Sequence, residues 1–175
     1  MNEDKCGAHY NRGMSDEQQH LRRLLGLDFG TKTIGLAVSD PLGITAQGLP
    51  TLRRKNKRTD LEMLARVIDQ FEVGEIVIGL PLRMSGAEGT MAEKVHDFVT
   101  ILHKQFSLPV HLWDERLTSA EANRVLRSSE MSIKRRGEVV DQLAAVLILQ
   151  SFMEARKNRE QGTTNREQGF GNGEQ

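Results

Sequence analysis

Short apolar runs alternate with turns over the first part of the chain, a pattern typical of strands. The run LLGLDF (24–29) is separated by a Gly-Thr-Lys turn from TIGLAVS (33–39), which predicts a β-hairpin. A third strand is expected over 46–52. The ordered part of the chain is therefore predicted to begin as a three-stranded meander.

From residue 59 onward, stretches with apolar residues at helical spacing alternate with shorter apolar runs. Helices are predicted over about 59–71, 91–106, 118–128 and 138–155, and strands over 75–81 and 109–115. Thr59 with Glu62, and Thr118 with Glu121, are expected to form capping boxes. The last helix contains LAAVLIL (143–149), which is apolar nearly all round and is therefore expected to be buried.

This order of elements predicts an α/β fold, a five-stranded mixed sheet with helices on both faces. We expect one domain over 21–157, with a disordered N-terminal arm (1–20) and a disordered C-terminal tail (158–175). Both end segments are polar and lack apolar periodicity, and the tail repeats NREQG. In such sheets, ligands bind beyond the carboxyl ends of the strands.

The charge balance permits a polyanionic partner without requiring one. The whole chain holds 24 basic and 24 acidic residues, whereas residues 21–157 hold 20 basic and 17 acidic, a net charge of +3. No run approaches the roughly 20 apolar residues needed to span a bilayer, so no membrane partner is expected. The single cysteine, Cys6, excludes an internal disulfide framework, and we expect a cytoplasmic protein.

Acidic residues stand at the edges of three apolar elements. Asp28 ends the first strand, Asp114 and Glu115 end the fifth, and Asp141 precedes the most apolar helix. A charge at the edge of a buried element is costly unless it is paired or bound to a metal. Each position also has a simpler explanation: Asp28 as a turn carboxylate, Asp141 as an acid stabilised by the helix dipole, and either Asp114 or Glu115 as a strand end that leads into solvent.

The stretch LGLDFGTKTIGLAVSD (25–40) is also similar to the first phosphate loop of actin-like and Hsp70-like ATPases. Those proteins close two such domains on one nucleotide, whereas this chain has room for one. A nucleotide-binding half-ATPase is therefore a distant alternative.

Four segments in order resemble the YqgF family of RNase H-like proteins: LDFGTKTIGLAVSD, IVIGLPLRMSGAEG, DERLTSAEA and EVVDQLAAVLILQ. The resemblance spans residues 24–155. It implies an RNase H-like fold and divalent-metal hydrolysis of phosphodiester bonds, in processing of the 5′ end of precursor 16S rRNA. The family's acidic residues carry over to Asp28, Glu115 and Asp141, which are expected to be both the catalytic residues and the metal ligands.

The chemistry of this donor set agrees with that expectation. Mg²⁺ and Mn²⁺ prefer oxygen ligands, and carboxylates from three element ends would supply them. Two such ions can activate water and stabilise the leaving oxygen. Two alternatives stay open: a Holliday junction resolvase acting on DNA, which needs two active sites and so a dimer, and a non-catalytic RNA- or ribosome-binding factor.

Substrate binding is expected from basic residues near the acidic positions and from a glycine-rich loop that precedes a helix. The expected substrate-binding residues are Lys32, Arg53, Arg54, Lys55, Gly86, Gly89, Arg116, Arg135 and Arg136. Charge runs of this kind are also typical of solvated loops. The expected partner is structured RNA, with branched DNA and a pre-ribosomal particle as further candidates, and the sequence leaves monomer and dimer open.

Overall fold

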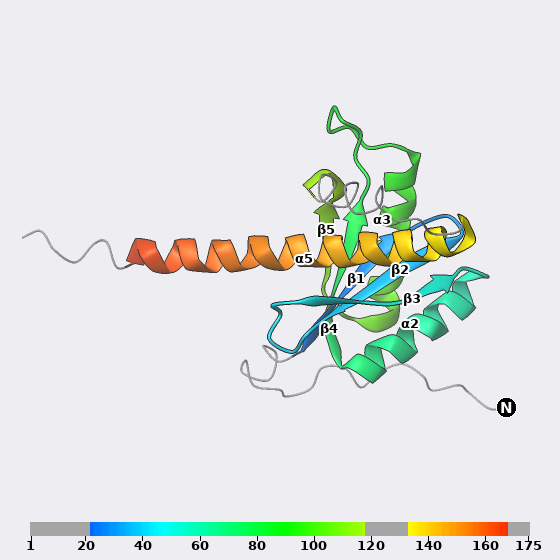
Figure 1. The fold of residues 1–175 in the computed structure, drawn as a ribbon, viewed down its shortest axis with the longest axis horizontal. Coiled ribbons are helices and arrows are strands. Elements are labelled where there is room, and N and C mark those ends of the chain that lie inside the picture. The colour runs from blue at the N-terminus through cyan, green and yellow to red at the C-terminus, as the bar shows by residue number, and fades with distance from the viewer. Residues whose placement is uncertain (1–21, 118–132, 168–175) are drawn as a thin grey trace, which may run out of the picture.

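A five-stranded mixed sheet forms the centre of the molecule in the computed structural model, which describes residues 22–117 and 133–167 (Figure 1). Its strands lie in the order β3-β2-β1-β4-β5. Strands β1, β2 and β3 pair antiparallel, and β4 and β5 run parallel to β1. The bounds are β1 (Arg23–Phe29), β2 (Thr33–Ser39), β3 (Ala46–Arg53), β4 (Val73–Leu80) and β5 (Val110–Asp114). The predicted meander and mixed sheet are confirmed.

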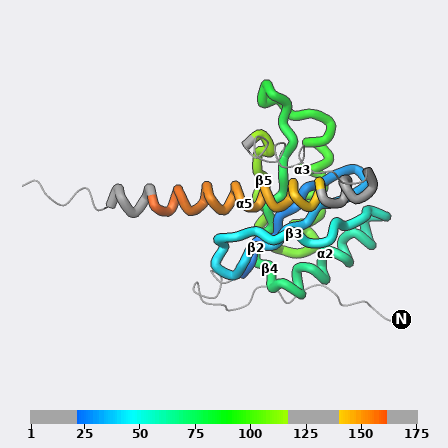
Figure 2. The backbone as a smooth tube through the Cα atoms, in the orientation of Figure 1, coloured from blue at the N-terminus to red at the C-terminus, as the bar shows by residue number. Residues whose placement is uncertain are grey.

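Helices cover both faces of this sheet, as the sequence predicted. Helices α2 (Lys57–Phe71) and α3 (Thr90–Phe106) pack on one face, and α5 (Ile133–Glu167) crosses the other (Figures 1 and 2). A short 3₁₀ turn, η1 (Glu115–Leu117), follows β5. The helix expected over 118–128 lies outside the described residues.

Alternation along β1 separates two cores. Leu25, Leu27 and Phe29 point into the larger core under α2 and α3, where Phe29 stacks on Phe98 with ring centroids 4.4 Å apart. Leu24 points to the opposite face and into the smaller core. That core also contains Ala37, Val77, Ala145, Ile148, Leu149 and Met153. The same alternation places Asp28 on the face that α5 covers.

Helix α2 begins earlier than predicted. Asn56 is its N-cap, because Asn56 Oδ1 accepts a hydrogen bond from the Thr59 backbone N–H at 3.0 Å. Glu62 pairs instead with Arg58 at 2.9 Å. The predicted capping box of Thr59 and Glu62 is therefore wrong: asparagine caps helices as well as threonine does, and Asn56 comes three residues sooner.

Helix α5 is longer at both ends than the predicted 138–155. It begins at Ile133 and ends at Glu167, so that it includes residues 158–167, which their low-complexity sequence predicted to be disordered. Adding residues to a formed helix costs little, and five of these ten residues are the helix formers Arg, Glu and Gln. None of the helices among the described residues, α5 included, is long and apolar enough to cross a membrane.

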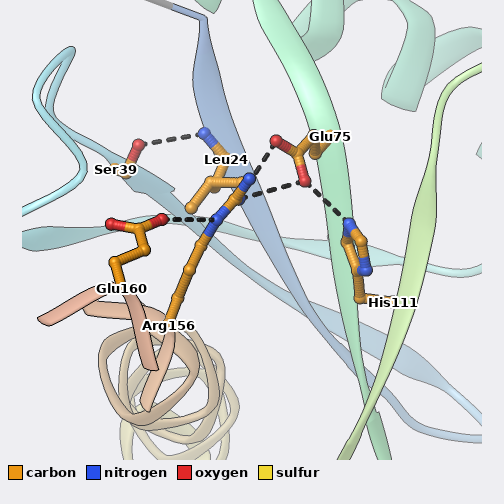
Figure 3. A network of polar contacts seen from close by, with 6 residues as sticks. All are labelled: Leu24, Ser39, Glu75, His111, Arg156 and Glu160. Atoms are coloured by element: carbon orange, nitrogen blue, oxygen red, sulfur yellow. Dashed lines mark hydrogen bonds and ion pairs between the residues drawn. The ribbon is translucent and has the colours of Figure 1, made fainter. Parts of the chain in front are cut away.

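A polar network anchors α5 near the amino ends of β4 and β5 (Figure 3). Arg156 of α5 donates from Nη1 to both carboxylate oxygens of Glu75, at 3.0 and 3.1 Å. Glu75 Oε2 also lies 2.7 Å from His111 Nε2 on β5. Glu75 therefore joins the helix to β4 and β5.

Candidate active site

Two of the predicted acidic residues meet where α5 crosses the β-hairpin. In the antiparallel register of β1 and β2, Asp28 lies opposite Gly35. A Cβ added at Gly35 would collide with the backbone carbonyl oxygen of Asp141. The glycine therefore lets the backbone of α5 approach β2 directly, which brings Asp141 beside Asp28.

Glu115 reaches the same edge of the sheet from the end of β5. Trp113 pairs with Gly79 of β4, and a Cβ added at Gly79 would lie 2.5 Å from Glu115 Oε1. The Glu115 side chain is therefore folded back over β4. Leu27 of β1 pairs with Ile78, so Asp28 and Gly79 are the next residues along two adjacent strands.

The structure distinguishes the two acids at the end of β5. Asp114 is bound by Arg116: Arg116 Nη2 donates to Asp114 Oδ2 at 2.6 Å, and Nε donates to both carboxylate oxygens at 3.0 Å. These bonds hold the pKa of Asp114 below its usual value. Because successive residues of a strand point to opposite faces, only one of the two can face Asp28. That residue is Glu115, whose pKa the charge of Asp28 raises.

The simpler explanations for Asp141 and for Asp28 lose their support. Helix α5 begins at Ile133, so Asp141 lies more than two turns inside it, beyond the reach of the dipole at its first turn. The Gly30 N–H donates to the Thr33 carbonyl at 2.9 Å and not to Asp28. A helix-dipole role for Asp141 is therefore wrong, and the turn after Asp28 closes without its carboxylate.

Burial and neighbouring carboxylates raise the pKa of Asp28 and of Glu115. Burial first, and then repulsion from Asp141, raise the pKa of Asp28 from 3.8 to about 6. Burial, then Asp28, then Asp114 raise the pKa of Glu115 from 4.5 to about 7. Among the described residues no three acidic, histidine or cysteine side chains are close enough to hold one metal ion as they stand. The backbone thus gathers three anionic oxygen donors, the type that a hard divalent cation takes, while their side chains do not converge on one point.

These pKa values predict that the metal-free protein loses stability as the pH rises. A carboxyl group with a raised pKa keeps its proton longer when folded, so the folded state binds more protons between pH 4 and 7 and its free energy of unfolding falls through that window. Mn²⁺ is expected to raise the melting temperature more at pH 8 than at pH 5, because only the charged form binds it.

Thermal unfolding from pH 4 to 8, with and without Mn²⁺, measures this. Asp28→Asn removes one titrating group, so the difference between wild type and the variant isolates its contribution from those of other acids. A melting temperature of the metal-free protein that rises steadily to pH 8, in parallel with that of the variant, would contradict the prediction.

Several of the predicted substrate-binding residues surround this edge of the sheet. Lys32, Arg53 and Lys55 are exposed, and the Lys32 carbonyl accepts a hydrogen bond from the Arg54 N–H at 2.9 Å, which holds the two segments together. Arg116 is exposed beside Glu115. Gly86 and Gly89 lie in the loop after β4, and residues 135 and 136 lie in the first turns of α5, with side chains outside the described part.

Arg54 is engaged in supporting the turn that follows Asp28. Its Nη1 donates to the Gly30 carbonyl at 2.9 Å, and its guanidinium carbon lies 4.4 Å from the centre of the Phe29 ring. Its Nε lies 3.4 Å from Asp60 Oδ2. Asp60 is only 2% exposed and also accepts the Lys55 N–H at 2.9 Å. Sequence reasoning missed Asp60, although an acid in the first turn of a helix directly after a basic run was a visible signal.

Asp60→Ala is expected to lower the free energy of unfolding by about 1–3 kcal/mol, because it leaves the Lys55 N–H and the Nε–H of Arg54 without their acceptor. Chemical denaturation measures the loss. Asp97→Ala, an exposed acid on α3, is the matched control and is expected to change stability by less than about 0.5 kcal/mol. Equal effects of the two substitutions would show that the Arg54–Asp60 pair contributes little.

Comparisons with known proteins identify the family to which the chain is similar. A family model described as "RuvX: Holliday junction resolvase" matches residues 22–155. A Koribacter versatilis protein named "Putative pre-16S rRNA nuclease" is 69% identical over 134 residues, which cover 77% of this chain and 88% of that relative. A Thermoanaerobacter pseudethanolicus protein with the same name is 49% identical over 138 residues, 78% of this chain and 99% of that relative.

The fold is shared with a solved structure. The structure titled "T. thermophilus RuvC in complex with Holliday junction substrate" superimposes with a TM-score of 0.50 at 15% identity, over 78% of this chain and 96% of that chain. At this identity the similarity concerns the fold, and it confirms the predicted RNase H-like architecture.

Proposed function

The chain belongs to the RuvX family, a family of nucleases, and on that premise we propose that it is a metal-dependent nuclease that processes the 5′ end of precursor 16S rRNA. The observation that supports the chemistry is that Asp28 lies near two carboxylates from other elements, because Asp141 raises the pKa of Asp28 and Asp28 raises that of Glu115. The names of the two relatives support the choice of substrate.

Asp28, Glu115 and Asp141 would hold Mg²⁺ or Mn²⁺, which supplies activation of water and stabilisation of the leaving oxygen when bound. The chain's contribution is a rigid support for the three carboxylates. Asp28 lies within a paired strand, Glu115 lies over Gly79, and Asp141 is fixed by the close contact of α5 with Gly35. A cation at this place favours the charged forms of Asp28 and Glu115, which burial and mutual repulsion disfavour.

The basic residues would hold the RNA backbone on this edge. Lys32, Arg53 and Lys55 lie beside the turn that follows Asp28, and their charges suit a line of phosphates. Arg116 has its guanidinium oriented by Asp114, next to Glu115, and would contact the scissile phosphate. Such a substrate would place the protein at precursor ribosomal particles in the cytoplasm.

A second candidate is cleavage of four-way DNA junctions, which the description of the family model favours. Phosphate and metal contacts are common to RNA and DNA, so the acidic site serves either substrate. Symmetric cleavage of a junction needs two active sites, and this candidate therefore requires a dimer.

The test offers both substrates to the same preparation. The purified full chain, with Mg²⁺ or Mn²⁺, is incubated with 5′-extended 16S rRNA fragments and with synthetic four-way junctions, beside Asp28→Asn as control. We expect cleavage of the rRNA extension by the wild type and not by the variant. Cleavage of the junctions alone would support the second candidate, and RNA binding without cleavage in either metal would indicate a non-catalytic factor.

A further inference from the structure

The segment between β4 and α3 projects from the sheet (Figure 1). It also carries an unusually exposed apolar side chain. Met84 is 94% exposed, more than any other large hydrophobic residue that the structure describes. A single exposed methionine needs no explanation by itself. The setting of Met84 is what points to a function.

Met84 is presented on an ordered turn, here called the Met84 turn (residues 82–88). The Arg83 N–H donates to the Ala87 carbonyl at 3.0 Å, and the Gly86 N–H donates to the Arg83 carbonyl at 2.8 Å. Gly86 has a φ of 84°, a conformation that favours glycine. The first and last residues of the turn pair as an antiparallel bridge. The turn therefore holds Met84 at a defined place beyond the carboxyl end of β4.

Two arginines flank the base of this turn. Arg116 Nη1 lies 3.5 Å from the position of a Cβ added at Gly86, and Arg83 Nε lies 3.6 Å from one added at Gly89. Both arginines are exposed, and Asp114 fixes the orientation of Arg116. The turn thus has an apolar tip and two guanidinium groups at its base, where Glu88 pairs with His96. Arg116 directly follows Glu115 of the acidic site along the chain.

An apolar tip above two cations is complementary to a nucleic-acid strand, which exposes apolar base faces beside anionic phosphates. Methionine suits such a contact because its unbranched, polarisable side chain adapts to a base of any identity. The same turn would suit a protein surface less well, since a single apolar side chain buries little area.

We propose that Met84 is a wedge that packs on the last base pair of a duplex segment and unstacks the adjoining nucleotide next to the scissile phosphate. Arg83 and Arg116 bind the phosphates on either side. This role rests on the proposed nuclease function and adds to it a preference for substrates in which paired and unpaired strands meet. Because stacking is independent of base identity, the wedge selects shape rather than sequence.

The test measures binding without metal, so that cleavage does not interfere. The probe is an RNA hairpin with a single-stranded extension and 2-aminopurine at the last unpaired position, whose fluorescence rises when it is unstacked. The wild type is expected to raise the fluorescence. Met84→Ala is expected to abolish most of the rise and to weaken binding about tenfold, and Met84→Leu to restore both. Leu42→Ala is the matched control, because Leu42 is 71% exposed and lies in the loop after β2, at the end of that strand away from Asp28.

Salt dependence separates the wedge from the phosphate contacts. Met84→Ala is expected to keep the slope of log Kd against log salt, whereas Arg83→Ala lowers it by about 0.7–0.9, the equivalent of one phosphate contact. Wild-type fluorescence and affinity in Met84→Ala would overturn the wedge and leave Met84 as a contact for a protein. If the wild type unstacks the probe but does not cleave RNA in Mn²⁺, the wedge stands and the proposed nuclease function is refuted. If the wild type binds no RNA, both proposals are overturned.

Discussion

Asp141→Asn is expected to reduce cleavage by about three orders of magnitude while the protein stays folded and binds its substrate at least as tightly. The amide keeps the shape of the carboxylate and removes one negative charge from a site where charges already repel. A polyanionic substrate is then repelled less. Metal occupancy falls, and the several kcal/mol that the ions contribute to the transition state are lost.

Single-turnover cleavage in Mn²⁺, beside substrate affinity and thermal melting with and without Mn²⁺, measures the three effects separately. Glu154→Gln is the matched control: it makes the same chemical change on the same helix, at an exposed position, and is expected to be neutral. A variant of Asp141 that cleaves at the wild-type rate would remove Asp141 from the site and leave Asp28 and Glu115 as the pair to study.

Gly35→Ala is expected to damage both stability and activity, although it adds one methyl group far from solvent. That methyl would collide with the backbone of α5 at Asp141, and backbone cannot rotate away as a side chain can. Overpacking of this kind costs about 1–3 kcal/mol. The helix has to shift, and a displacement of about 1 Å at a catalytic group can cost about a hundredfold in rate.

Gly48→Ala is the matched control on the neighbouring strand. Its added methyl would meet the side chain of Gln142, which can move, instead of the helix backbone. We expect it to unfold and cleave nearly as the wild type does, by chemical denaturation and by the single-turnover assay. Equal damage from both substitutions would show that α5 tolerates no change along this face, so that the contact at Gly35 is not special.

Local patterns in the sequence were sufficient to predict the elements that set the architecture. The alternating runs around Leu25 and Leu36 predicted the hairpin, and the apolar stretch 143–149 predicted a buried helix. These patterns are visible in the sequence because each face that packs in the core must carry apolar side chains. Asp28 and Asp141 were visible as acids at the edges of apolar elements. Helix ends were predicted less well, because Asn56 offered an earlier cap than Thr59 and because helix propagation costs little beyond Ala155.

Only the tertiary structure decided how those acids and cations are arranged. Asp114 and Glu115 are adjacent and equally acidic in sequence, and the contact of Arg116 with Asp114 is what separates their roles. Arg54 belongs to a basic run, yet contacts with residues distant along the chain give it a supporting role. The sequence by itself determined which elements form, because each buries its own apolar face. It did not determine which carboxylates lie near one another, because that depends on how closely α5 approaches the sheet. Gly35 leaves room for that approach, but a glycine in the sequence does not show that the backbone of Asp141 occupies the room beside it.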